Sequence, residues 1–291
     1  MKKIVVLSDI DGTLLDTTNN VPQVFQSFLE KLRMKNIDLY FATSRSPQNV
    51  LNLLKEYNIS YYAICSDGAS FVKIEQQNMS IVHEENLSQD ETCKILDALC
   101  NVTFAPFLLF TNHSNNYDII SIETQMSQDG HIYELLSDGR KIVNYATFEQ
   151  VIDKKEIINS VRAISFFNTS EVIDRVYEQL SSNTFFKRFK LYRYRETRLD
   201  NNSYSWLDIM PQHLSKGAVV SKFMDTVFNE TFIIGLGNDI NDLEMLKLSN
   251  ISFCPINSNS IIKHLHGMRV INHCNGNDFL LQIMQFLEQD I

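Results

Sequence analysis

The first part of the chain alternates short apolar runs with helical spacings. Residues 4–8, 37–45 and 61–65 are rich in apolar side chains and predict three buried strands. Helices are expected between them, beginning near Asn20 and at Ser46-Pro47, because proline is favoured in the first turn of a helix. Their apolar stripes are Val21, Val24, Phe25, Phe28 and Leu32, and Val50, Leu51 and Leu54. This order predicts a parallel sheet covered by helices on both faces.

A similar alternation returns near the end of the chain. Residues 204–210 and 231–237 predict strands, and residues 217–228 and 242–248 predict helices. These segments have the lengths and flanking polar residues expected of the same kind of parallel sheet. We therefore expect the two ends of the chain to build one domain.

The middle of the chain has a different pattern. Ser88 and Glu91 form a capping-box signature at the start of a helix. Strands are expected over residues 104–110, 117–124 and 161–167, followed by a helical stripe of Val172, Ile173, Val176 and Leu180. The middle of the chain is therefore predicted to be an inserted α/β domain.

The predicted fold is therefore α/β, with a doubly wound parallel-sheet (Rossmann-like) core and an inserted α/β cap domain. The core comprises residues 1–83 and 201–291, and the inserted domain comprises residues 84–200. A chain of 291 residues is long enough for two such domains.

Composition and charge narrow the class of protein. Hydrophobic residues make up 44% of the chain, and the formal net charge is −9, which disfavours nucleic acid and membrane surfaces as partners. The five cysteines include no CxxC pair, so neither a disulfide framework nor a zinc knuckle is expected. No signal peptide or membrane-spanning run is evident, and we expect a cytoplasmic monomer or homodimer.

Polar residues follow four of the predicted core strands. They are Asp9, then Thr43-Ser44-Arg45, then Asp67, and finally Asn238-Asp239 with Asn241-Asp242 just beyond. Each group alone has an ordinary interpretation as a turn, a helix cap or a solvated loop. In an open parallel sheet, however, the carboxyl ends of the strands share one edge, where ligands bind. The four groups are therefore expected to converge on one site.

The close carboxylates of Asp9 and Asp11 require a cation nearby, because like charges repel and are costly to desolvate. Mg²⁺ suits such hard oxygen ligands. A calcium-binding loop does not fit at either candidate position. After Asp9 the glycine comes too early, at Gly12, and after Asp239 the position expected to be glycine is Glu244. Dinucleotide binding does not fit either, since Ile240 stands where a third glycine is needed. A Mg²⁺ site with a spare carboxylate and a lysine suits phosphoryl transfer.

Ordered motifs along both core segments resemble those of the haloacid dehalogenase superfamily, in the form of its Cof-like, subfamily IIB phosphatases. Residues 9–14, Asp-Ile-Asp-Gly-Thr-Leu, resemble the first motif, and residues 42–45, Ala-Thr-Ser-Arg, the second. Residues 208–217 resemble the third motif and residues 235–246 the fourth. Residues 65–69 are similar to a segment that usually reads Asn-Gly-Ala. The family's α/β cap is inserted between the second and third motifs.

The resemblance implies a role for each matched residue. Asp9 would be the nucleophile that forms an aspartyl phosphate, and Asp11 the general acid and base. Thr43 and Lys216 would stabilise the transferring phosphoryl group. Substrate and phosphate binding would involve Gly12, Thr13, Ser44, Arg45, Asp67, Gly68 and Asn241. Mg²⁺ would be held by Asp9, the backbone carbonyl of Asp11 and residues of the fourth motif, among Asn238, Asp239 and Asp242.

The fourth motif departs from the family's usual Gly-Asp-x-x-Asn-Asp form. Asn238 stands where the first, metal-binding acid is expected. Either the Asn238 amide oxygen ligates Mg²⁺, or the loop shifts so that Asp239 does. We favour Asp239, because a carboxylate is the better Mg²⁺ ligand. His213 and residues 251–264 also depart from the family's usual sequence. Asn257, within the second of these segments, is given no catalytic role.

The predicted function is a Mg²⁺-dependent phosphatase acting on a small phosphorylated metabolite, a sugar or polyol phosphate. A sugar phosphomutase and a catalytically impaired binding or regulatory protein on the same fold are the alternatives. The basic and aromatic stretch 186–198 has three interpretations: solvated surface, a source of substrate contacts, or a nucleic-acid-binding segment, which the acidity of the rest of the chain disfavours.

Overall fold

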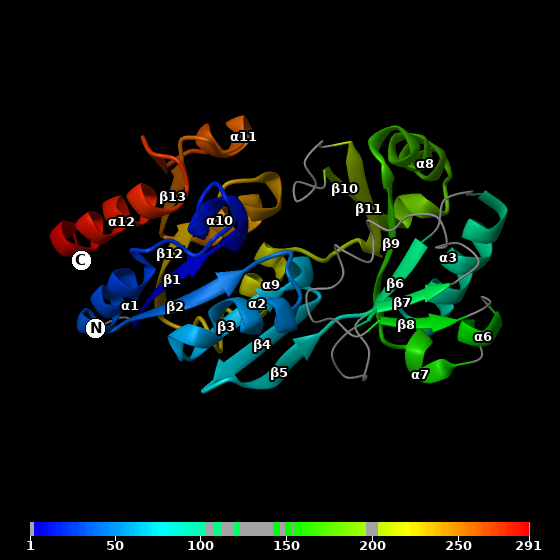
Figure 1. Cartoon of the computed structure of the whole chain (residues 1–291), viewed down its shortest axis with the longest axis horizontal. Coiled ribbons are helices and arrows are strands. Elements are labelled where there is room, and N and C mark those ends of the chain that lie inside the picture. The colour runs from blue at the N-terminus through cyan, green and yellow to red at the C-terminus, as the bar shows by residue number, and fades with distance from the viewer. Residues whose placement is uncertain are drawn as a thin grey trace. The chain divides into compact units, whose positions relative to one another are not determined.

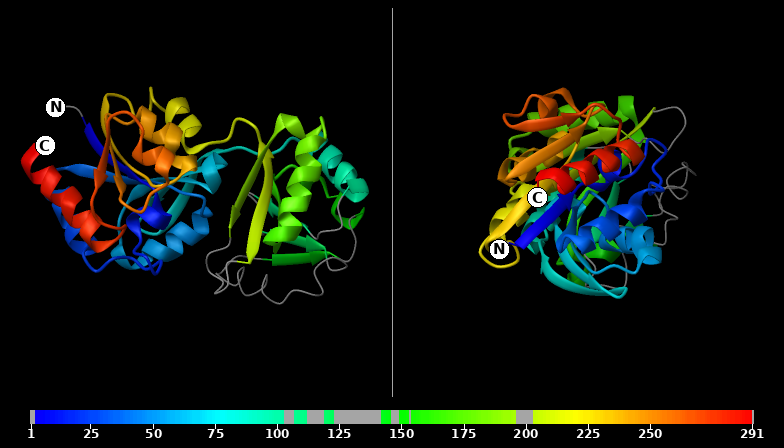
Figure 2. Two further views of the ribbon diagram at one scale, coloured as in Figure 1. Left: turned by 90° about the horizontal axis from the view of Figure 1, so that it is seen from above. Right: turned by 90° about the vertical axis from the view of Figure 1, so that its left-hand side faces the viewer.

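The chain folds into two compact units. A computed structural model describes residues 3–102, 107–111, 119–122, 142–145, 149–152, 154–195 and 203–290. The first unit consists of Met1–His83 and Ser215–Ile291, and the second of Glu84–Leu214. Figures 1 and 2 show the elements of each unit from three directions.

The first unit is built on a sheet whose described strands follow the order β14-β13-β12-β1-β2-β3-β4-β5. From β14 to β3 all pairings are parallel, and β4 pairs antiparallel with β3. The strands are β1 (Lys3–Ser8), β2 (Ile37–Ala42), β3 (Tyr61–Cys65), β4 (Ser70–Glu75), β5 (Asn78–Glu84), β12 (Thr231–Leu236), β13 (Ile251–Pro255) and β14 (Met268–Ile271).

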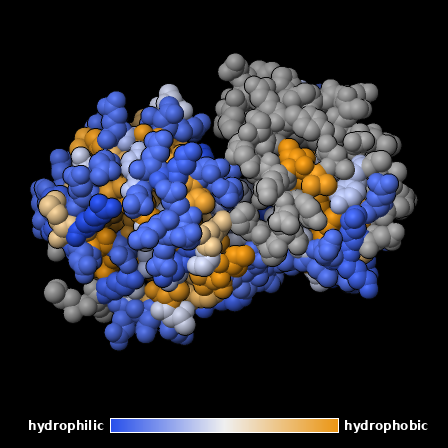
Figure 3. All heavy atoms as spheres, turned by 60° about the horizontal axis from the view of Figure 1, so that its bottom comes forward, coloured by the Kyte–Doolittle hydropathy of each residue, from blue (hydrophilic) through white to orange (hydrophobic). Residues whose placement is uncertain are grey.

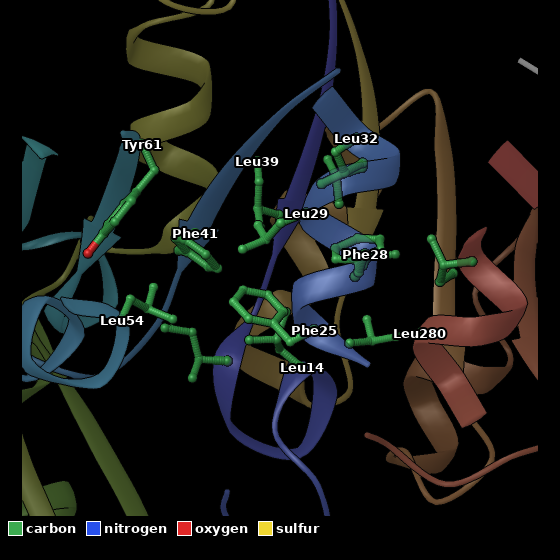
Figure 4. Close-up of a cluster of buried hydrophobic side chains, with 14 of the residues drawn as sticks. Leu14, Phe25, Phe28, Leu29, Leu32, Leu39, Phe41, Leu54, Tyr61 and Leu280 are labelled. Carbon is green, nitrogen blue, oxygen red and sulfur yellow. The ribbon is translucent and has the colours of Figure 1, made fainter. Parts of the chain in front are cut away.

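Helices cover both faces of this sheet. The helices are α1 (Phe25–Met34), α2 (Pro47–Leu54), α9 (Lys216–Lys222), α10 (Leu243–Leu248), α11 (Ser260–Lys263) and α12 (Asn277–Asp290). Apolar side chains of α1, α2 and α12 pack on one face, where Figure 4 shows Phe25 and Phe28 of α1 among Leu39, Phe41 and Leu280. Side chains of α9, α10 and α11 pack on the other face, with Val5 and Leu7 of β1. The predicted doubly wound parallel-sheet core is confirmed.

The order of the central strands brings distant parts of the sequence to one edge of the sheet. Strand β1 lies between β12 and β2, with Ser8 opposite both Leu236 and Phe41. Because β12, β1, β2 and β3 are parallel, their carboxyl ends share this edge. The segments that follow the four strands are those in which polar clusters were predicted.

The second unit is a sheet with helices of its own. Its described strands follow the order β10-β11-β9-β6-β7-β8, antiparallel except for β7 with β8. They are β6 (Phe107–Thr111), β7 (Ile119–Ile122), β8 (Ile142–Tyr145), β9 (Val161–Thr169), β10 (Phe189–Arg195) and β11 (Tyr204–Pro211). The helices are α3 (Gln89–Val102), α6 (Glu149–Ile152), α7 (Lys155–Ile158) and α8 (Ser170–Ser182). A separate hydrophobic core stabilises this unit.

The boundary predicted at residues 200 and 201 is wrong. Strand β11, expected to belong to the core, pairs with β9 and β10 in the second sheet, and the chain returns to the first unit at Ser215. Leu207 and Ile209 lie opposite Phe166 and Ile164 and are buried with them. The apolar run of β11 predicted a strand, but it held no information about which sheet the strand would join.

Some other elements begin or end at residues different from those predicted. Helix α1 begins at Phe25, since Pro22 to Val24 form a turn in which the Phe25 N–H donates to the Pro22 carbonyl. Helix α9 ends at Lys222 rather than near residue 228. The Ser46 cap of α2 and the Ser88–Glu91 capping box are both present. The start of the strand predicted over 104–110, both ends of that over 117–124, and Arg198 lie outside the described residues.

The exposed faces of both units carry many polar side chains. Most of the coloured surface in Figure 3 is hydrophilic, with small hydrophobic areas between. Among the described helices, none is both long and apolar enough to cross a lipid bilayer. In the second unit, cations of the basic stretch have local partners: Arg188 pairs with Glu91, Arg193 with Asp174, and Lys190 donates to the Leu214 carbonyl.

Candidate active site

A buried ion cluster lies at the carboxyl edge of the first sheet. The Lys216 ammonium donates to Asp9 Oδ1 at 2.6 Å and to Asp242 Oδ1 at 2.7 Å. The side chains of Lys216 and Asp242 are 1% and 0% exposed, so solvent screens these ion pairs very little. Asp9 directly follows β1, and its N–H donates to the Leu236 carbonyl of β12. The cluster therefore joins the ends of two neighbouring strands to the first turn of α9.

The charges of this cluster shift one another's proton affinity. Burial raises the pKa of Asp9 well above its ordinary value, the Asp242 carboxylate adds to this shift, and Lys216 opposes it. Burial alone would lower the pKa of Lys216, but Asp242 and Asp9 raise it. The lysine is thus held as a cation between two carboxylates. One ammonium facing two buried carboxylates leaves an excess of negative charge, so a further cation would help to keep Asp9 ionised.

The local sequence around Lys216 fixes its position. Ser215 caps α9 by accepting a hydrogen bond from the Ala218 N–H at 2.9 Å, and its hydroxyl donates to Glu244. Gly217 lets α9 approach α10 closely, since a Cβ there would lie 2.3 Å from Glu244 Cβ. Glu244 was not singled out from the sequence, because no local pattern links it to a serine 29 positions earlier.

The loop after β12 is organised by Asp242. Its Oδ2 accepts hydrogen bonds from the Asn238 N–H at 2.8 Å and the Asp239 N–H at 3.1 Å. The Asp239 carboxylate is turned to the helix start instead, where it accepts from the Ile240 N–H and from Asn259 Nδ2 at 3.0 Å. Asp239 therefore acts as a helix cap with an asparagine partner that the sequence did not reveal.

The Asn238 side chain points to the loop that carries Asp9 and Asp11. Its Oδ1 accepts a hydrogen bond from Thr13 Oγ1 at 3.2 Å. Its Nδ2 lies over Gly12, where a Cβ would be only 2.3 Å away. Gly12 also has a φ of 74°, a left-handed conformation that favours glycine. Gly12 thus leaves room for the Asn238 amide beside the first motif.

Asp11 lies on the outer side of the cluster, paired with Arg45. Arg45 Nε donates to Asp11 Oδ2 at 2.8 Å, and Arg45 Nη2 donates to Asp11 Oδ1 at 2.7 Å. The Asp11 side chain is 47% exposed and the Arg45 side chain 27%. Both are therefore far more accessible to solvent than Lys216 and Asp242.

A second polar network lies beside the cluster. Asp67 is buried, and its Oδ1 accepts hydrogen bonds from Ser44 Oγ at 3.1 Å and Asn241 Nδ2 at 3.0 Å. Ser66, Asp67 and Gly68 all have positive φ, and the Asp67 N–H donates to the Thr43 carbonyl. The turn after β3 is thereby fixed to the segment after β2. As a carboxylate, Asp67 accepts hydrogen bonds and orients the two donors.

Thr43 completes the edge between the two networks. It is fully buried at the end of β2, its N–H donates to the Ile64 carbonyl of β3, and its Oγ1 accepts from the Arg45 N–H at 3.1 Å. Gly68 lies close to the backbone of Ser215, and a Cβ on Gly68 would be 2.5 Å from the Ser215 carbonyl oxygen. The turn after β3 can therefore approach the start of α9 only with glycine at this position.

All the residues predicted for the site therefore lie in the first unit, and all except Lys216 follow the core strands expected to carry them. Lys216 begins α9, just after the chain returns from the second unit. Lys216 donates to both Asp9 and Asp242, Arg45 to Asp11, and Thr13 to Asn238. Ser44 and Asn241 both donate to Asp67. Asp239 stands apart, since its carboxylate caps a helix. Asn257 donates to Asn275, which in turn donates to the Leu15 carbonyl.

The oxygen donors near Asp9 fit a hard divalent cation. No group of three or more His, Cys, Asp or Glu side chains suited to a metal occurs among the described residues. The candidate set is mixed: the Asn238 amide lies beside Gly12 and accepts from Thr13, on the loop that follows the Asp9 carboxylate and includes the Asp11 backbone carbonyl. Mg²⁺ accepts such a set, because it binds few protein oxygens and retains several waters.

A parallel α/β sheet with paired acids, a buried lysine and hydroxyl donors at its carboxyl edge has the features of an enzyme active site. The chain belongs to the family described as haloacid dehalogenase-like hydrolases, whose model matches residues 6–276. The resemblance of the ordered motifs to this superfamily is thereby confirmed.

Curated relatives and solved structures agree with this family. The chain is 23% identical over 271 residues to the HMP-PP phosphatase of Citrobacter koseri, covering 92% of this chain and 90% of that protein. It is also 23% identical to the HMP-PP phosphatase of Shigella flexneri over 281 residues, covering 94% and 91%. A haloacid dehalogenase-like hydrolase from Bacteroides thetaiotaomicron superposes with a TM-score of 0.72 at 16% identity, covering 98% and 99% of the two chains. A Thermotoga maritima crystal structure has a TM-score of 0.75 at 17% identity, covering 97% of each.

Proposed function

We propose that this chain is a Mg²⁺-dependent phosphatase that hydrolyses a small phosphorylated metabolite, a sugar or polyol phosphate, through an aspartyl phosphate on Asp9. The observation that carries the proposal is the buried cluster in which Lys216 bridges Asp9 and Asp242. The names of the curated relatives support a phosphatase. The cluster suits this chemistry because it presents a carboxylate and a fixed positive charge at one point.

In the proposed reaction, the Asp9 carboxylate attacks phosphorus, and the bond between phosphorus and the leaving oxygen breaks. Asp11 gives its proton to that oxygen, so the product leaves as an alcohol. Asp11 then removes a proton from water as the water attacks the aspartyl phosphate, which restores Asp9 and releases inorganic phosphate. Asp11 follows Asp9 by two residues, which places both carboxyl groups at the end of β1.

The phosphoryl group would be bound by donors at the same carboxyl edge of the sheet as Asp9. Lys216 contributes positive charge, and Thr43, Ser44 and Asn241 contribute hydroxyl and amide donors. Asp67 orients Ser44 and Asn241. Asp9, the Asp11 carbonyl and Asn238 would hold Mg²⁺, with Asp242 fixing the loop through the Asn238 N–H. The ion would offset negative charge between the nucleophile and the phosphate.

The second unit is proposed to act as the cap that selects the substrate. It has its own hydrophobic core and is inserted in the chain between His83 and Ser215, which allows its sequence to vary independently of the site. The residues 186–195 remain candidates for substrate contacts. We further propose that the enzyme acts in the cytoplasm as a monomer or homodimer, without nucleic acid or membrane partners.

A screen of phosphorylated metabolites tests the proposal. Phosphate release is measured with Mg²⁺, with EDTA, and with the Asp9→Asn variant as control, because an amide is a poor nucleophile. We expect release from a subset of compounds, abolished by EDTA and by Asp9→Asn. Equal release by that variant, full activity in EDTA, or no release from any compound including p-nitrophenyl phosphate would refute it.

A further inference from the structure

We infer that Arg45 selects substrates that carry a second anionic group on the leaving side of the scissile phosphate, and that binding of this group releases Asp11 from Arg45. The group is a carboxylate or a second phosphate, either of which offers two acceptor oxygens. The inference rests on the proposed phosphatase function and names a class of substrate for it.

The first observation is the geometry of the ion pair. Both oxygens of Asp11 accept a hydrogen bond from the same guanidinium, at 2.7 and 2.8 Å. Such a two-pronged pair is an interaction of the ionised carboxylate with the planar arginine fork. The same planar fork matches the oxygens of a carboxylate or a phosphate on a ligand. A second anionic group can therefore take the place of Asp11 on Arg45.

The second observation is where the pair lies. Lys216 and Asp242 are 1% and 0% exposed, whereas Arg45 and Asp11 are 27% and 47% exposed. The reacting phosphoryl group must reach Asp9, which is buried beside Lys216. The leaving group then extends outward, past Asp11 and Arg45. A second anion on the leaving group would consequently meet Arg45 rather than Lys216.

The third observation is the backbone of Arg45. Its N–H donates to Thr43 Oγ1 and its carbonyl accepts from the Ser66 N–H, so the main chain is fixed beside the phosphoryl donors. Exchange of partners can then occur by rotation of the side chain. The Asp11 pair is partly solvated, and ion pairs of this kind contribute little to stability. The second anionic group of the substrate can therefore displace Asp11 at low cost.

The experiment compares two phosphate esters that differ only in the second group. In 2-phosphoglycolate the second group is a carboxylate, and in 2-hydroxyethyl phosphate it is a neutral hydroxymethyl. We measure kcat/KM for both with the wild type, Arg45→Gln and Arg45→Lys. The matched control is Arg33→Gln, which removes an exposed arginine on α1.

We expect the wild type to prefer 2-phosphoglycolate by about tenfold to 100-fold, the range for hydrogen bonds to a charged group. Arg45→Gln should bring the ratio close to one, Arg45→Lys should keep part of it, and Arg33→Gln should keep all of it. A merely structural role for Arg45 would lower both rates and leave their ratio unchanged. If neither ester is turned over, their inhibition constants against p-nitrophenyl phosphate give the same ratio.

Two results would overturn the inference. A wild-type ratio near one, with an equal loss on both esters in Arg45→Gln, would mean that Arg45 serves the reacting phosphoryl group. A preference that persists in Arg45→Gln would place the selecting cation elsewhere. Failure of the proposed function looks different, since then no phosphate is released even from p-nitrophenyl phosphate.

Discussion

The inner and outer halves of the site contain the same kinds of charge in opposite settings. Inside, Lys216 is fixed between Asp9 and Asp242, and solvent is excluded. Outside, Arg45 holds Asp11 in a pair that solvent reaches. A buried ion pair cannot be broken without exposing a charge to a medium that solvates it poorly. A partly solvated pair exchanges partners readily. The inner half therefore suits the fixed parts of the reaction and the outer half the part that must change protonation and partner.

Changing the outer half should lower turnover far more than stability. Asp11→Asn should lower turnover by about 10²- to 10⁴-fold, the range for loss of general acid–base catalysis. Unfolding free energy should change by only about 1 kcal/mol or less, because the Arg45 pair is partly exposed. Steady-state kinetics and urea denaturation of the same samples measure the two quantities.

The matched control for Asp11→Asn is Asp38→Asn. It breaks another exposed pair, that of Asp38 with Lys3 at 2.9 Å, far along the strands from the site. Its turnover should equal that of the wild type. A loss of stability of several kcal/mol in Asp11→Asn, with turnover preserved, would contradict the account, because Asp11 would then have a structural role and no role in proton transfer.

Changing the inner half should lower stability as well as turnover. Lys216→Met leaves Asp9 and Asp242 buried without a counter-charge, so unfolding of the first unit should become easier by about 3–5 kcal/mol. Urea denaturation in EDTA measures the change. Lys222→Met, at an exposed position on the same helix α9, should alter stability by about 0.5 kcal/mol or less. Equal stability of the two variants would show that the cluster is more solvated than its burial indicates.

A smaller effect is expected at the metal position, where the geometry favours Asn238 over the Asp239 ligand favoured by the sequence. Asn238→Asp should lower the Mg²⁺ concentration for half-saturation by about tenfold, since it adds a negative charge beside Gly12, and Asn238→Ala should raise it. Asp239→Asn should change it little, because that carboxylate caps a helix. Titration of the thermal midpoint with Mg²⁺ measures binding independently of turnover. A strong effect of Asp239→Asn with none at Asn238 would restore the ligand favoured by the sequence.

How much was predictable depended on whether a feature is local. The central strands and the Ser46 cap follow from apolar spacing and from serine before proline, so the parallel core and its polar edge were predictable. The placement of β11 was not, because its partners β9 and β10 are selected by tertiary packing. The Arg45–Asp11 pair and the cap made by Asp239 with Asn259 were likewise hidden. Each joins side chains whose meeting depends on the assembled sheet.

The most direct test of the central claim is detection of a phosphoryl group on Asp9. The wild type is mixed with p-nitrophenyl phosphate and Mg²⁺, quenched in acid during turnover, digested, and analysed by peptide mass spectrometry. The peptide containing Asp9 should gain the mass of one phosphoryl group in the wild type, and the same peptide of Asp9→Asn should gain none. Phosphate release without this modification, or a phosphoryl group on a different residue, would contradict the role of Asp9 as the nucleophile.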